Sequence, residues 1–153
     1  LCDDGYDADP LAELFTEDAV WDGGPIGAHH GREAIRAFFR GSSARVPFAL
    51  HLVTNPIIDV DGDAATGRWY LWEPLVYAFP QGERAYWMSA RYDDRYRRTA
   101  DGWKFERVAI TALGVEQEGG QVIHVSVSIL PRGASPGLQR SWRSVCRREP
   151  NAP

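Results

Sequence analysis

Residues 84–97 read RAYWMSARYDDRYR and alternate between two kinds of side chain with a period of two. Successive side chains of a β-strand point to opposite faces, so this segment is predicted to be a strand with an apolar face and a charged face. The apolar face carries Tyr86, Met88, Ala90, Tyr92 and Tyr96, and the charged face carries Arg91, Asp93, Arg95 and Arg97.

More strands are predicted on both sides of this segment. Turn signals at Asn55-Pro56, Asp61-Gly62 and Asp101-Gly102 separate them. A strand as long as 64–79 exceeds the usual length, which predicts strong curvature of the sheet. The predicted strands are 48–54, 57–60, 64–79, 103–113 and, as an optional last member, 122–130.

Two helices are predicted before most of these strands. Asp9-Pro10 is typical of an N-cap followed by the first helical position, and GREAIRAFFRG at 31–41 has an apolar stripe at helical spacing. Residues Leu1–Asp4 fit the end of a helix that Gly5 stops, and residues 19–21 fit a brief strand. Helices followed by a strand meander predict an α+β domain, in which a curved antiparallel sheet and the helices across its concave face enclose a pocket.

Length and composition restrict the class of protein. A chain of 153 residues with 44% hydrophobic residues is expected to fold around one core. Without a run of 18 apolar residues, no membrane span is expected, and the net charge of −4 argues against a general nucleic-acid binder. Cys2 and Cys146 are too few for a disulfide framework, so reduced thiols and a cytoplasmic location are expected.

The charge is divided unevenly along the chain. Residues 1–131 hold 12 basic and 20 acidic side chains, a balance of −8, whereas residues 132–153 hold five arginines and one glutamate, a balance of +4. We therefore expect a single domain over 1–131 and a basic tail over 132–153. The tail is either partly disordered or folded back so that Trp142 covers a pocket.

Polar residues on predicted apolar faces are the candidates for chemistry. Glu73 shares its face with Trp69 and Leu71, so it needs a partner if it is buried, or it meets water at a strand end. His51 is either a catalytic base or a structural histidine in its strand. Arg107 is a possible partner for a buried carboxylate, although both faces of its strand are apolar enough to be covered.

Asp94 lies between Tyr92 and Tyr96 on one face, where a structural pair with an arginine is favoured over catalysis. No metal site is expected, because the adjacent His29-His30 point apart on an extended backbone and no cysteine cluster exists. Phosphate-loop and nucleophile-elbow motifs are absent from the sequence as well.

Four stretches carry a resemblance to a known family: LAELFTEDAVWDG at 11–23, GREAIRAFF at 31–39, the His51 strand ending in Asn55-Pro56, and YDDRYRRTADGWKF at 92–105. The chain resembles the nuclear transport factor 2-like superfamily over residues 1 to about 115. Within it, the chain is similar to the polyketide-cyclase-like branch that includes scytalone dehydratase, bile-acid 7α-dehydratase and hexachlorocyclohexane dehydrochlorinase. This resemblance implies a cone-shaped α+β barrel around a pocket.

The resemblance also implies a set of site residues. The related lyases hold an Asp–His dyad with about 48 positions between its members, which matches Asp3 and His51, with Asp4 as the alternative carboxylate. Their pocket-lining positions fall on Trp21, Trp69, Leu71 and Tyr92. Their arginine near the last long strand falls closest to Val108, so Arg107 would contact substrate only if a bulge turned it inward.

The predicted function is a cofactor-independent lyase of the dehydratase or dehydrohalogenase type. His51, oriented by Asp3, is expected to remove a carbon-bound proton from a small hydrophobic cyclic molecule, and Glu73 or Tyr92 to help the leaving group depart. The alternatives are an isomerase or cyclase with the same base, and a non-catalytic binding protein for a hydrophobic ligand. The resemblance also implies a homotrimer that forms through the outer face of the sheet.

Overall fold

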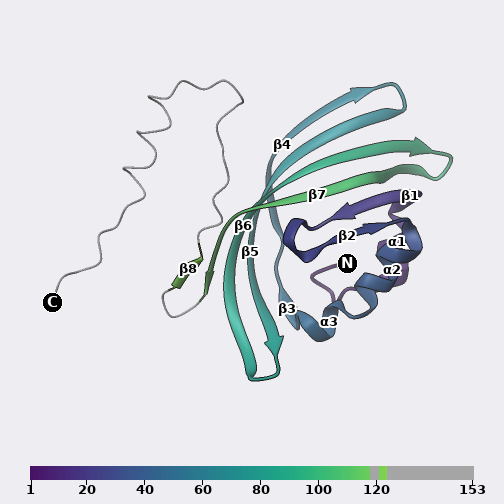
Figure 1. Ribbon diagram of the computed structural model, residues 1–153. Helices are drawn as coiled ribbons and strands as arrows, with labels where there is room; N and C mark the ends of the chain where they lie inside the picture. The colour runs from purple at the N-terminus through teal and green to yellow at the C-terminus, as the bar shows by residue number, and fades with distance from the viewer. Residues whose placement is uncertain (118–120, 124–153) are drawn as a thin grey trace, which may run out of the picture.

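The computed structural model describes residues 1–117 and 121–123, and the predicted tail at 132–153 lies outside them. Short helices come first and long strands follow, so the predicted α+β class is confirmed (Figure 1). The helical elements are α1 (Ala8–Glu13), the 3₁₀ turn η1 (Gly24–Ile26), α2 (Arg32–Arg40) and α3 (Ser42–Arg45). The strands are β1 (Phe15–Asp22), β2 (Ala28–His30), β3 (Phe48–Ala49), β4 (Leu52–Asp61), β5 (Ala64–Phe79), β6 (Gly82–Thr99), β7 (Gly102–Gln117) and β8 (Gln121–Ile123).

The described strands form one curved sheet that stays open. Its path is β2-β1-β7-β6-β5-β3, while β4 pairs with β5 and β8 pairs with β7. The pairing is antiparallel except between β1 and β7, which run parallel and correct the expectation of a purely antiparallel sheet. The N-terminal turn and the helices lie within the concave side (Figure 1). We call the face toward the helices the inner face and the opposite one the outer face.

Irregular pairing accompanies the curvature of the long strands. The 18 residues of β6 would extend roughly 60 Å if flat, at about 3.3 Å per residue. The register shifts between Thr54 and Ile57 in β4, where Asn55 has a φ of 53°, and between Ser89 and Ala90 in β6. Such bulges increase local twist and bend a strand. The predicted interruption at Asn55-Pro56 is therefore a bulge within one strand.

The first residues form a tight turn that Gly5 closes. The Tyr6 N–H donates to the Leu1 carbonyl and the Gly5 N–H to the Cys2 carbonyl, both at 3.2 Å, with Gly5 at a φ of 101°. These bonds have the pattern of a Schellman helix end, as the position of Gly5 predicts. The turn orients Asp3 toward the start of β4, where its carboxylate reaches His51.

The start of α1 differs from the prediction. Asp7 is the N-cap, because its side chain accepts the Asp9 N–H, and Asp9 lies inside the first turn. There the Asp9 carboxylate accepts a hydrogen bond of 2.9 Å from Arg36 of α2, and Glu13 accepts another of 3.0 Å from the same guanidinium. Asp9, which the sequence suggested as the N-cap, therefore forms an ion pair that links α1 to α2.

The core lies where α1 and α2 pack on the inner face of β1 and β7. Ile35 is fully buried, and Phe39 of the same predicted amphipathic helix contacts Trp21. The remaining buried members of this cluster are Ala8, Leu11, Phe15, Ala19 and Val108. None of the described helices is long and apolar enough to cross a membrane.

Gly67 in β5 permits a close approach of two aromatic side chains. A Cβ at this position would lie 2.9 Å from Trp69 Nε1 and 2.9 Å from Tyr96 Cε2. We expect Gly67→Ala to lower the free energy of unfolding by about 1–3 kcal/mol, because the two rings must move apart. Gly114→Ala is the matched strand control, since its Cβ meets only Ser89 Oγ at 3.3 Å. Equal losses in urea denaturation of the two variants would contradict this account.

Candidate active site

His51 is held by one carboxylate through both its backbone and its ring. The His51 N–H donates to the two oxygens of Asp3 at 3.1 and 3.2 Å, and Nδ1 lies 2.5 Å from Asp3 Oδ1. Since an ionised carboxylate only accepts hydrogen bonds, we assign the ring proton to Nδ1. The other ring nitrogen, Nε2, is then free to accept a proton.

Glu73 of β5 faces the free ring nitrogen. Its Oε1 lies 3.3 Å from His51 Nε2, and its side chain is only 4% exposed. Burial raises the pKa of the Glu73 carboxyl above its ordinary value; His51 opposes this rise and the charge of Asp3 adds to it. Glu73 is therefore buried with His51 as its partner, and it does not meet water at a strand end. The imidazole therefore lies between two carboxyl groups.

His51 and Asp3 line a cavity of about 430 Å³ on the inner side of the sheet. This size falls in the range of small-molecule sites. Trp21, Trp69 and Tyr92 line it as well, at positions singled out from the sequence. Leu71 and Glu73 do not border it; both are buried in β5. The other lining residues are Leu1, Cys2, Leu11, Leu14, Phe15, Phe39, Val53, Asp94, Tyr96, Phe105 and Val108.

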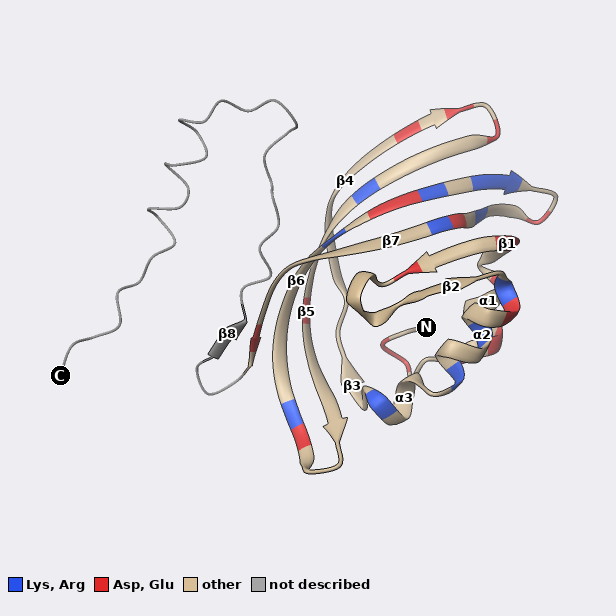
Figure 2. Cartoon of the chain, viewed as in Figure 1, with Lys and Arg blue, Asp and Glu red and all other residues tan. Residues whose placement is uncertain are grey.

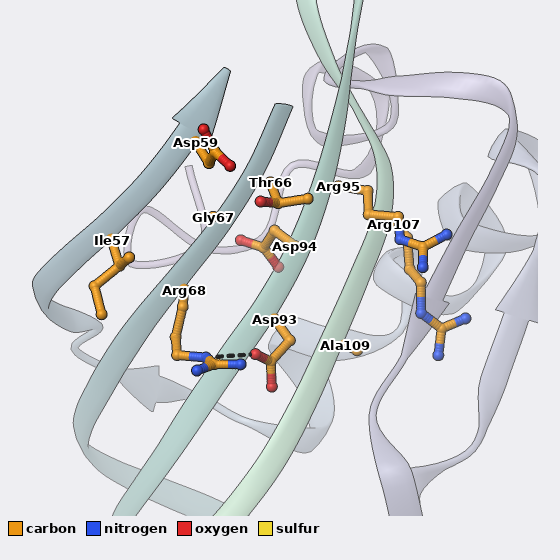
Figure 3. Close-up of a pocket in the computed structure, with 10 residues that line it drawn as sticks. All are labelled: Ile57, Asp59, Thr66, Gly67, Arg68, Asp93, Asp94, Arg95, Arg107 and Ala109. Atoms are coloured by element: carbon orange, nitrogen blue, oxygen red, sulfur yellow. Dashed lines mark hydrogen bonds and ion pairs between the residues drawn. The ribbon is translucent and has the colours of Figure 1, made fainter. Parts of the chain in front are cut away.

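Arg107 lies outside this cavity, which corrects its assignment as a pocket residue. It borders a second pocket, of about 460 Å³, on the outer face, where Figure 3 shows it beside Arg95. Its Nη2 donates to Asp22 Oδ2 at 2.7 Å. Arg95 pairs with Arg107 but the next residue, Tyr96, pairs with Phe105, so Glu106 is an extra residue and β7 has a bulge beside Arg107. This bulge breaks the alternation after Phe105, so Phe105 and Val108 both line the cavity and Arg107 points outward.

The cavity wall also contains Asp94, for which the sequence favoured a structural role, and Tyr96, which the sequence did not single out as a site residue. The Tyr96 hydroxyl donates to Asp94 Oδ2 at 2.9 Å and accepts from Trp69 Nε1 at 3.1 Å. We call Trp69, Asp94 and Tyr96 the Asp94 cluster. The expected arginine partner of Asp94 is not found among the described residues, where Tyr96 is its hydrogen-bonding side chain. The alternation of β6 placed Asp94 and Tyr96 on one face, but only the sheet register brings Trp69 to them.

Burial keeps the other polar groups of the wall uncharged. It raises the pKa of the Cys2 thiol to about 11, so this side chain is a thiol at neutral pH. Burial also raises the pKa values of Tyr92 and Tyr96 above that of an ordinary phenol. Among the side chains described, no group of three or more His, Cys, Asp or Glu residues could hold a metal ion. The arrangement favours proton transfer by His51 in a largely apolar space.

Three solved structures are similar to this chain. A Novosphingobium aromaticivorans protein provisionally assigned as an aromatic ring hydroxylase is 32% identical, with a TM-score of 0.68 over 76% of this chain and 82% of its own. A provisional scytalone dehydratase from the same species is 21% identical, with a TM-score of 0.64 over 84% and 81%. Hexachlorocyclohexane dehydrochlorinase LinA-type3 from Novosphingobium barchaimii is 22% identical, with a TM-score of 0.64 over 79% and 82%. The latter two likenesses show the fold alone.

A curated relative and a family model agree with this fold. Rv2910c, an uncharacterized protein of Mycobacterium tuberculosis, is 32% identical over 100 residues, which are 65% of this chain and 67% of the relative. The model of the SnoaL-like domain matches residues 1–109, which carry the helices, Asp3, His51 and all the lining residues of the cavity. The nuclear transport factor 2-like fold predicted from the sequence is confirmed, and the chain belongs to the SnoaL-like domain family.

Proposed function

We propose that this protein is a cofactor-independent lyase that eliminates water or a hydrogen halide from a small hydrophobic cyclic molecule. The observation that carries this proposal is the His51 imidazole, with Nδ1 against Asp3 and Nε2 facing buried Glu73. The fold shared with a dehydrochlorinase and a provisional dehydratase supports this class of reaction. The provisional hydroxylase is named for an aromatic ring, which agrees with a cyclic substrate.

In the proposed step, His51 Nε2 takes a proton from carbon, and the electron pair of that C–H bond forms a C=C bond. The bond from the neighbouring carbon to the leaving oxygen breaks, and the imidazolium gives the Nε2 proton to that oxygen, so water leaves and His51 is a neutral imidazole again. Glu73 does not border the cavity, but its Oε1 lies 3.3 Å from Nε2. A protonated Glu73 leaves the Nε2 proton free for the leaving oxygen, whereas an ionised Glu73 would hold that proton.

Asp3 is the positioning residue for this step. Its carboxylate holds the proton-bearing Nδ1 and stabilises the imidazolium that forms when Nε2 accepts a proton. The same carboxylate also accepts hydrogen bonds from the His51 backbone N–H, which hold the main chain of His51, and with it the ring, in place. The apolar wall, with Trp21, Trp69 and Tyr92, offers a cyclic hydrocarbon skeleton a surface that excludes water.

Replacement of His51 tests the base directly. We expect His51→Ala to lower kcat/KM about 10²–10⁴-fold on a true substrate, because a positioned general base contributes that much. Substrates are found by screening hydroxylated and halogenated cyclic compounds for loss of water or halide by mass spectrometry. Ligand affinity should change little, whereas the free energy of unfolding should fall by about 1–3 kcal/mol, because buried Glu73 loses its partner.

His30→Ala is the matched control for this variant, because His30 is an exposed histidine in β2. It should retain wild-type turnover. Full activity of His51→Ala would refute the assigned role of the base. A wild-type protein that binds ring compounds and turns none of them over would favour the non-catalytic binding protein.

The rate should depend on pH through the proton that His51 and Glu73 share. Activity requires one proton on this pair, so kcat should fall about tenfold per pH unit once that proton is lost. Since burial raises the pKa of Glu73, the loss is displaced upward from the range of an exposed glutamate. Glu73→Gln should lower kcat and remove this alkaline decline, whereas an unchanged profile in Glu73→Gln would show that the Glu73 proton does not control the rate.

We also propose that the protein is a homotrimer that associates through the outer face. Trp72 and Trp87 are 48% and 43% exposed and stack at 5.6 Å between ring centroids on adjacent strands, and Ile57 on β4 is 65% exposed. Large apolar side chains grouped on a surface are typical of interaction sites. The middle of β5 and β6 around the two tryptophans carries little charge (Figure 2). The expectation of three subunits comes from the resemblance to lyases of the dehydratase type.

Light scattering of the wild type should give a mass of three times 17.1 kDa. Ile57→Arg should reduce this mass, because it buries a charge in the interface. Ile58→Arg is the matched control, since Ile58 is 54% exposed and alternates to the other face of β4. A wild-type mass of one protomer, or equal dissociation of both variants, would contradict association through the outer face.

A further inference from the structure

The cavity has a second polar end that the proposed elimination does not use. His51 precedes β4 beside Glu73, whereas Asp94 pairs with Gly67 of β5. Gly67 lies six positions before Glu73, which is roughly 20 Å along an extended strand at about 3.3 Å per residue. Both His51 and Asp94 nevertheless border the same cavity.

An unmet hydrogen-bonding atom distinguishes this end. Asp94 is only 6% exposed, and its Oδ2 accepts the Tyr96 hydroxyl, but its Oδ1 has no partner in the described part of the chain. An unpaired buried polar atom costs about 1–3 kcal/mol. Native structures rarely leave such an atom unpaired without a functional reason or a bound group.

The neighbouring groups are oriented so that they do not satisfy this oxygen. Trp69 Nε1 donates to the Tyr96 oxygen, and the Tyr96 hydroxyl proton is directed to Asp94 Oδ2. Arg68 and Arg91 pair with Asp93, which points to the outer face. Burial raises the pKa of the Asp94 carboxyl to about 6, so near neutral pH it exchanges between an acid that donates and a carboxylate that accepts.

We propose that Asp94 is a specificity-determining residue that binds a hydroxyl group of the ligand at the end of the cavity far from His51. A hydroxyl suits both states of the carboxyl, because it accepts a hydrogen bond from the acid and donates one to the carboxylate. It also adds no charge to a space walled by Phe105, Val108 and Tyr92. The substrate class is then a hydrophobic ring compound with a hydroxyl remote from the reacting carbon.

The inference rests on the proposed function only in treating the ligand as a substrate, because binding of a hydroxyl group at Asp94 can be measured without turnover. The probes are p-cresol and p-xylene, which differ by a hydroxyl in place of a methyl group. Titrations are made in the His51→Ala variant, so that the imidazole cannot hold the hydroxyl. Calorimetry gives the two affinities, and the NMR signal of the Trp69 indole N–H reports events at the Asp94 cluster.

We expect p-cresol to bind at least about 10-fold more tightly than p-xylene, as for one hydrogen bond to a group that can ionise. The Trp69 indole signal should shift with p-cresol and much less with p-xylene. Asp94→Leu should remove the preference for p-cresol, whereas Asp94→Asn, which retains polar atoms of similar shape, should keep most of it.

Equal affinities of the two probes, or a p-cresol preference that survives in Asp94→Leu, would overturn the inference. If Asp94→Leu does not fold, the test uses the Trp69 indole signal of the His51→Ala variant. Equal shifts of this signal with p-cresol and p-xylene would exclude a hydroxyl site at this end of the cavity. Neither the two affinities nor the Trp69 signal depends on catalytic activity, because both are measured by binding to the His51→Ala variant. Failure of the lyase proposal, seen as turnover in His51→Ala, is therefore distinguishable from failure of the hydroxyl site.

Discussion

The contact between Asp3 and His51 joins the first turn of the chain to the beginning of β4. One carboxylate accepts hydrogen bonds from the backbone N–H and from the ring of the same residue, so it fixes both the path of the chain and the rotamer of the imidazole. Without it, Nε2 would have no fixed position relative to Glu73, and the turn that Gly5 closes would have no polar contact with the sheet at this point. Such charge-assisted bonds are stronger than neutral ones.

The distribution of charge between the two sides of the sheet constrains the ligand. Carboxyl groups border or adjoin the cavity at Asp3, Glu73 and Asp94, and no lysine or arginine is among its described lining residues. The arginines of the same strands, Arg68, Arg95 and Arg107, border the outer pocket (Figure 3). A ligand that carried a negative charge would meet carboxyl groups without a compensating cation. This arrangement favours a neutral ligand, as expected for a hydrophobic ring compound.

Periodicity in the sequence predicted much of the fold, and local geometry decided the rest. The alternation at 84–97 and the spacing at 31–41 describe β6 and α2 closely, because each has one buried face. The orientation of Arg107 depends on the exact position of a bulge, which leaves no signature in the residue pattern. The pairing of Asp3 with His51 followed from a family resemblance, since no local rule links residues 48 positions apart. The Asp94 cluster required the register of β5 against β6, which is set by tertiary packing.

Asp93 and Asp94 show how far alternation alone can separate two identical neighbours. Asp93 points to the outer face, where burial opposes ionisation but hydrogen bonds from Arg68 and Arg91 outweigh it and lower the pKa of the carboxyl. Asp94 points inward, where burial dominates and raises the pKa to about 6. A shift of the β6 register by one residue would exchange their environments and place a salt-bridged carboxylate in the cavity. The chemistry available to this protein therefore depends on the same pairing of β5 and β6 that builds the sheet.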